Sequence, residues 1–300
     1  MKHWFKAAWA VVLVSGALAQ EKKTGLPAGV TVSRDQVYAQ RGERPLKLDL
    51  YRARDAEGRL PVVLWVHGGG WNQGSKDRCP AAWLAQKGFA VASVEYRLST
   101  EARWPAQMED CRDAVRWLRD HAAELGFDAD HIGVWGGSAG GHLVALMGTL
   151  PLPEGEKTSA RVQAVCDWYG PSDLLTMPPN VVSEKRSREQ VEKSNGAILL
   201  GAPIMDVPEL AKRCSAFHQV SAGDAPFLIM HGEKDPMVPL EQSEKLDAAL
   251  RGAGVESELV IIPEGGHGGA AFQTDAVREK VQRFFDKHLR PGRDKAAPKS

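Results

Sequence analysis

Two glycine-rich segments, each directly behind an apolar run, hold the residues that could carry out chemistry. They are His67-Gly-Gly-Gly-Trp71 and, further along the chain, Gly136-Gly-Ser-Ala-Gly140. A serine between glycines after a strand lies on a tight strand-to-helix turn, because a neighbouring Cβ would clash with the returning backbone. The first segment offers backbone N–H groups that can point at a developing oxyanion. In this order the two segments indicate acyl transfer, with Ser138 as the nucleophile.

Short apolar runs predict the strands that position these segments. Residues 46–51 alternate between apolar and polar side chains, which predicts a half-buried, antiparallel edge strand. The other runs are apolar on both faces, as expected for parallel strands that helices cover on both sides. These runs span residues 62–66, 90–94, 132–135, 162–166, 227–230 and 258–262.

Helical patterns lie between the apolar runs. In residues 107–125, apolar side chains recur at steps of three and four, with Pro105 near the start and Gly126 at the end. Residues 240–252 and 274–289 show the same pattern. Because strand and helix alternate, the sequence predicts an α/β fold with an open, doubly wound and mostly parallel sheet.

Two segments depart from this alternation. Residues 172–222 are rich in proline, serine and charge, and they are too long for an ordinary connection in a compact domain. We interpret them as a lid-like insertion between late strands, over the mouth of the site. Residues 291–300 are expected to form a disordered tail, so that the domain would span residues 20–290.

The first 19 residues have the features of a secretory signal peptide. A positive start, an apolar stretch over residues 7–18 and the small residues of Ala17-Leu-Ala19 predict cleavage before Gln20. The apolar stretch is shorter than the roughly 20 residues that span a bilayer, and no later segment is long and apolar enough. The sequence therefore predicts a secreted or periplasmic protein without a membrane span.

The composition argues against nucleic acid as a partner. The formal net charge is zero and 43% of the residues are apolar, which is typical of a globular protein that does not bind nucleic acid.

The cysteines could form two disulfides or remain small buried residues, and the sequence leaves this open. They are Cys79, Cys111, Cys166 and Cys214. Because no Cys or His spacing suggests zinc, we expect no metal and no cofactor.

The order of the segments resembles the α/β-hydrolase fold over roughly residues 30–290. In that fold the catalytic residues occur in the order Ser, Asp or Glu, His, each past the C-terminal end of a strand. Ser138, Asp235 and His267 follow this order. The resemblance therefore implies that Asp235 orients His267, and that His267 takes the proton from Ser138.

Other residues compete for two of these roles. Glu233 lies on the same loop as Asp235 and is the alternative acid. His267 alone is both C-terminal to the acid and in a glycine-rich loop after a strand. The rival histidines are His67, His142, His231 and His288. Of these, the first two are expected to brace the backbone.

Backbone N–H groups are expected to hold the oxyanion. We assign this role to Ala139, which follows the nucleophile, together with Gly69 and Gly70. Which glycine of residues 68–70 donates is open by one position.

Three aromatic residues are expected to line the mouth of the site and to bind substrate. They are Trp71, Trp168 and Tyr169. Aromatic faces suit a sugar ring or an aryl acyl group. Packing of these side chains beneath the 172–222 insertion is the alternative.

The His-Gly-Gly-Gly segment resembles the hormone-sensitive-lipase-like carboxylesterases, but those carry a substantial N-terminal cap. The chain is more similar to secreted bacterial acetyl xylan and feruloyl esterases, in residues 67–74, 96–99, 105–107, 116–119 and 169–174. This resemblance implies a serine carboxylesterase that hydrolyses short-chain or aromatic esters, either small molecules or acetyl and feruloyl groups on plant polysaccharide.

Two other classes of protein share the fold. A serine peptidase similar to the prolyl oligopeptidases has the same triad order, but it usually carries a large β-propeller and lacks His-Gly-Gly-Gly. A catalytically inert binding protein would typically lose a triad residue, whereas all three are present. The esterase interpretation is therefore favoured, while the acyl group, the alcohol and the oligomeric state stay open.

Overall fold

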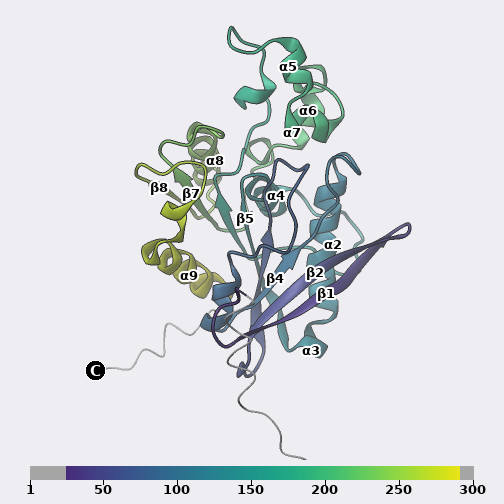
Figure 1. The fold of residues 1–300 in the computed structure, drawn as a ribbon, viewed down its shortest axis with the longest axis vertical. Coiled ribbons are helices and arrows are strands. Elements are labelled where there is room, and N and C mark those ends of the chain that lie inside the picture. The colour runs from purple at the N-terminus through teal and green to yellow at the C-terminus, as the bar shows by residue number, and fades with distance from the viewer. Residues whose placement is uncertain (1–24, 291–300) are drawn as a thin grey trace, which may run out of the picture.

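The computed structural model describes residues 25–290, so the expected signal peptide and tail lie outside the described residues. An eight-stranded sheet runs through the domain in the order β1-β2-β4-β3-β5-β6-β7-β8 (Figure 1). The strands are β1 (Val30–Arg41), β2 (Arg44–Ala53), β3 (Leu60–Val66), β4 (Ala90–Val94), β5 (Phe127–Gly137), β6 (Ala164–Trp168), β7 (Phe227–Gly232) and β8 (Ser257–Ile262). Strand β2 is antiparallel to both β1 and β4, and all other neighbours are parallel.

This arrangement confirms the predicted fold class, and every predicted apolar run overlaps a strand. The strand predicted at residues 46–51 is antiparallel as expected, but it is not at the edge, because β1 pairs along its outer side. The sequence analysis missed β1. Most of its side chains are exposed or half-buried, so the strand lacks the apolar signal that marks the others.

Helices cover both faces of the sheet. On one face pack α2 (Ala106–Asp120), α4 (Ala139–Thr149) and α8 (Glu241–Gly252). On the other pack the short 3-10 helix η1 (Ala82–Lys87) and α9 (Asp275–Leu289). The alternation along β3 supplies both cores, since Val62, Leu64 and Val66 face α2 and α4 while Val63 and Trp65 face α9. The helix predicted over 107–125 is divided, because α2 ends before His121 and a short helix α3 (Ala122–Leu125) follows.

The insertion is built from short helices rather than open loop. It contains η2 (Pro178–Asn180), α5 (Arg188–Glu192), α6 (Asn195–Leu200), η3 (Ile204–Asp206), α7 (Pro208–Arg213) and η4 (Ala216–His218). Side-chain oxygens of Ser187 and Ser194 cap α5 and α6, and Pro208 opens α7. In Figure 1 these helices lie at the end of the sheet toward which the parallel strands point.

The sequence leaves open whether the four cysteines form disulfides. In the structure all four are free thiols. Within residues 25–290, no helix is long and apolar enough to cross a membrane.

Candidate active site

Ser138 lies on the sharp turn that joins β5 to α4. Its backbone has φ 57° and ψ −121°, a conformation that costs a non-glycine residue roughly 1–3 kcal/mol and is concentrated at functional sites. The turn is possible because Gly140 packs directly on β3. A Cβ on Gly140 would lie 2.0 Å from the carbonyl oxygen of Val66, so no larger residue fits.

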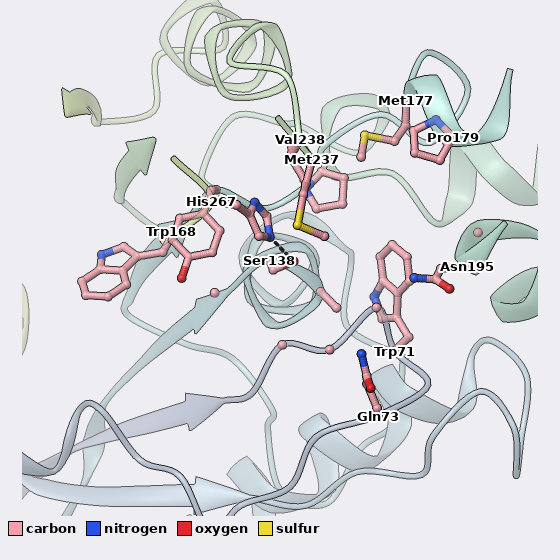
Figure 2. Close-up of a pocket in the computed structure, with 18 of the residues that line it drawn as sticks. Trp71, Gln73, Ser138, Trp168, Met177, Pro179, Asn195, Met237, Val238 and His267 are labelled. Carbon is pink, nitrogen blue, oxygen red and sulfur yellow. Dashed lines mark hydrogen bonds between the residues drawn. The ribbon is translucent and has the colours of Figure 1, made fainter. Parts of the chain in front are cut away.

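The structure brings Ser138, His267 and Asp235 into one hydrogen-bonded chain. His267 Nε2 lies 2.8 Å from Ser138 Oγ, and His267 Nδ1 lies 2.7 Å from Asp235 Oδ2. Figure 2 shows the imidazole above the serine, with a dashed line for the first of these bonds. Asp235 follows β7 and His267 follows β8, so three parallel strands deliver the three side chains to the same edge of the sheet.

The surroundings of Asp235 keep its carboxylate charged. Burial by itself raises the pKa of this carboxyl, but hydrogen bonds from His231, His267 and the backbone N–H groups of Val238 and Met237 outweigh it. The pKa therefore lies well below the usual range. An ionised carboxylate at this place can hold the tautomer of His267 that has its proton on Nδ1.

Glu233 forms no hydrogen bond with His267 within the described residues; its carboxylate instead accepts from the backbone N–H of Glu264 at 3.2 Å. His231 supports the loop that carries Asp235. Its Nε2 donates to the carbonyl of Val238 at 2.9 Å and lies 3.4 Å from Asp235 Oδ2. His67 and His288 form no hydrogen bond with Ser138 within the described residues. His67 stacks on Tyr96 beside the glycine-rich loop, and His288 lies beside Glu256.

His142 forms a buried link between the insertion and the glycine-rich loop of residues 67–71, the oxyanion loop. The indole N–H of Trp71 donates to His142 Nδ1 at 3.1 Å, and His142 Nε2 donates to the carbonyl of Cys214 at 2.7 Å. Both ring nitrogens are used only if the imidazole is neutral. Burial accordingly lowers the pKa of His142 to about 4, against the opposing effect of the bond to Cys214.

The glycine-rich loop after β3 presents unused N–H groups beside Ser138. The backbone N–H groups of Gly69, Gly70 and Ala139 donate to no acceptor within the described part of the chain. Gly69 has φ 108°, and a Cβ there would lie 2.2 Å from the carbonyl oxygen of Gln73. The loop therefore requires glycine to take this path, and the path leaves donors free for an oxyanion.

A cavity of about 420 Å³ adjoins Ser138. Figure 2 shows Trp168 and Trp71 on opposite sides of the serine, with Met177 and Pro179 from the insertion above. The two tryptophans line the cavity but are only 3% and 6% exposed, because Trp168 packs on Trp135 and Trp71 bonds His142. This burial favours packing as the main role of both indoles. Tyr169, which is half-buried, also lines the cavity.

The sequence analysis missed Asn195, through which the insertion contacts the oxyanion loop. Asn72 donates to Asn195 Oδ1 at 2.9 Å, and a Cβ on Gly70 would lie 2.2 Å from Asn195 Nδ2. This contact joins segments far apart in the chain, so no local pattern could have revealed it. Asn195 also lines the cavity (Figure 2).

No group of three or more His, Cys, Asp or Glu side chains within residues 25–290 could hold a metal ion.

Comparison with known proteins agrees with the geometry. The BD-FAE family matches residues 48–250, and the TAP-like protein family matches residues 209–297. Esterase LipQ of Mycobacterium tuberculosis is 33% identical over 260 residues, which are 81% of this chain and 60% of LipQ.

Two solved structures are also similar. A truncated carbohydrate esterase from gut microbiota has a TM-score of 0.75 and 28% identity, over 86% of this chain and 96% of that one. An acetyl ester-xyloside bifunctional hydrolase from Caldicellulosiruptor lactoaceticus has a TM-score of 0.70 and 27% identity, over 87% and 97%.

The fold and the site define an α/β-hydrolase related to carboxylesterases and carbohydrate esterases. The chain belongs to the BD-FAE family. It spans 51–60% of the length of LipQ and of two other mycobacterial ester hydrolases that it matches.

The geometry predicts that Asp235→Asn is far more damaging to ester hydrolysis than Glu233→Gln. An Asn can still contact the imidazole but favours the wrong tautomer, a change that costs about 10⁴ in kcat in a serine protease. Glu233→Gln should change kcat by less than about twofold, since one surface hydrogen bond contributes little. Steady-state rates on a short p-nitrophenyl ester measure both. A larger loss for Glu233→Gln would show that the acid has been misassigned.

The buried link predicts that Trp71→Phe destabilises the fold. The substitution leaves His142 Nδ1 buried without a donor. It should therefore lower the free energy of unfolding, measured by urea denaturation, by about 1–3 kcal/mol. Trp117→Phe is the control, because that indole is half-buried and stacks on His121. Rates on a sugar acetate and on phenyl acetate should fall together as the oxyanion loop shifts. Loss on the sugar ester alone, with stability unchanged, would instead support the sugar-binding role.

Proposed function

We propose that the protein is a serine carboxylesterase that uses Ser138, His267 and Asp235. The observation that carries this proposal is the unbroken chain of hydrogen bonds from Asp235 Oδ2 through His267 to Ser138 Oγ. That chain ends at a serine beside free backbone N–H groups. The relationship to esterases and carbohydrate esterases supports the same activity.

The proposed reaction has two halves. His267 Nε2 takes the proton of Ser138 Oγ as the oxygen attacks the ester carbonyl, and the N–H groups of Ala139 and of Gly69 or Gly70 hold the resulting oxyanion. The tetrahedral intermediate collapses, and the imidazolium of His267 returns the proton to the leaving alcohol. Water then attacks the acyl-enzyme, His267 takes its proton, and the carboxylic acid leaves as Ser138 recovers its own.

For the substrate we propose short-chain or aromatic esters, including acyl groups on plant polysaccharide. The similar solved structures include a carbohydrate esterase and an acetyl ester-xyloside hydrolase, and aromatic side chains line the cavity. We further propose that the protein is secreted or periplasmic. An enzyme that acts on polysaccharide outside the cell would need such a location.

The central test is Ser138→Ala. Removing the nucleophile should lower kcat on p-nitrophenyl acetate by about 10⁴–10⁶, with a residual rate from the oxyanion donors. The wild type should also react with one equivalent of a fluorophosphonate, and peptide mapping should find the label on Ser138. Labelling of another serine, or an unchanged rate in the variant, would refute the mechanism.

Acyl-chain preference should be short. The part of the insertion that lines the cavity includes the polar Asn180 and Asn195 beside Met177 and Pro179, so it offers no continuous apolar tunnel. A tunnel would reward each buried CH₂ with about 0.8 kcal/mol. We therefore expect kcat/KM on p-nitrophenyl esters to peak between acetyl and butyryl and to fall by octanoyl. A maximum at decanoyl or beyond would contradict this.

A further inference from the structure

The hydroxyl of Tyr169 lies between Gly137 and Gly268, which are chain neighbours of the two reacting residues. A Cβ on Gly137 would be 3.1 Å from this oxygen, and a Cβ on Gly268 would be 2.8 Å from it. Gly137 directly precedes Ser138 and Gly268 directly follows His267. Glycine at position 268 is needed for the hydroxyl to lie at this place in the cavity wall, and glycine at position 137 avoids a second tight contact.

The hydroxyl has no partner within the described part of the chain. By contrast, the hydroxyls of Tyr38 and Tyr96 donate to the carbonyls of Glu95 and His67 at 2.6 and 3.0 Å. Tyr169 is half-buried and lines the cavity, so the partner that its hydroxyl lacks can come from a molecule bound there. A phenol that lines a catalytic cavity without one is therefore suited to bind a substrate oxygen.

The ring of Tyr169 is held firmly in place. Its centroid lies 4.6 Å from that of His267 and 4.8 Å from that of Phe272. The backbone N–H donates to the carbonyl of Met230 at 2.9 Å, and the residue has φ 45°. Non-glycine residues at positive φ cost free energy and persist where the surrounding structure enforces them, often at functional sites.

The contact with His267 also decides which part of the ester Tyr169 faces. In the proposed reaction, the leaving oxygen must lie within hydrogen-bond reach of His267 Nε2, because it receives its proton from there. The oxyanion instead faces Gly69, Gly70 and Ala139. A hydroxyl whose ring packs on the imidazole is thus placed beside the alcohol.

Resting on the proposed esterase function, we propose that the Tyr169 hydroxyl donates a hydrogen bond to a second oxygen of the leaving alcohol, next to the ester oxygen. The substrate class is then esters of vicinal diols and sugars, in which a free hydroxyl neighbours the acylated one. The proton for this bond is available at neutral pH. Burial, followed by the charges of Asp235 and Asp167, raises the pKa of Tyr169 to about 12.

Tyr169→Phe tests this proposal, because it removes one oxygen and keeps the ring on His267. Two pairs of esters exchange hydroxyl for methyl: 2-hydroxyethyl acetate against propyl acetate varies the alcohol, and propyl glycolate against propyl propanoate varies the acyl group. We expect the variant to lose about three- to tenfold in kcat/KM on 2-hydroxyethyl acetate alone, the usual effect of one hydrogen bond. Tyr51→Phe on β2 is the matched control and should change none of the four rates.

Each other outcome is informative. An effect on propyl glycolate alone would place the hydroxyl on the acyl side and overturn the proposal. An equal loss on all four esters would mean that Tyr169 only positions His267, and an unchanged set of rates would exclude any contact with these oxygens. If the wild type hydrolyses none of the esters and Ser138 takes no fluorophosphonate, the esterase function itself fails, and this proposal fails with it.

Discussion

The close packing of the first turn of α4 on the end of β3 is the constraint on which the rest of the site depends. A Cβ on Gly140 would overlap the carbonyl of Val66, so the helix can approach this closely only with glycine there. The contact sets where α4 begins and holds Ser138 at positive φ. Because Val66 also pairs with Gly136 in the sheet, the nucleophile and the oxyanion loop leave neighbouring strands side by side. Their relative position therefore follows from sheet register.

The acid and base depend on a similar contact between two other strand ends. The loops after β7 and β8 are joined by backbone bonds, from Glu233 N–H to the carbonyl of Ile262 and from Lys234 N–H to that of Gly265. A Cβ on Gly232 would lie 2.3 Å from the carbonyl oxygen of Gly266. The two loops thus behave as one unit that presents Asp235 and His267 together. Such preorganisation keeps the imidazole in place before substrate arrives.

Much of this architecture could be predicted from the sequence, for a physical reason. Strands buried on both faces must be apolar throughout, so β3, β4 and β7 are visible as short apolar runs. Strand β1 is mainly exposed and carries no such pattern. The composition of the insertion indicates only a long polar segment, although the serines that cap α5 and α6 are local signals that favour short helices.

The site divides in the same way. Ser138 and the oxyanion glycines lie in segments whose backbone geometry demands particular residues. A short stretch of sequence is therefore enough to recognise them. Roles that depend on distant contacts were not visible. Nothing near Trp71 in sequence indicates that its indole bonds His142, and nothing near Asn195 indicates that it docks against Gly70. The residue type of Trp71 indicates that it could bind a sugar ring. The contacts that bury its indole decide how much of that surface a substrate can reach.

The link through His142 shows why such partners matter for function. Trp71 belongs to the oxyanion loop, His142 to the helix that carries the nucleophile, and Cys214 to the insertion. The link holds only while the imidazole is neutral, because a protonated Nδ1 could not accept from the indole. Burial lowers the pKa of His142 to about 4, so the ring of His142 is neutral at neutral pH. Two histidines close to one serine are thus separated in role by environment: one is free to exchange protons, and the other holds the oxyanion loop, the helix and the insertion together.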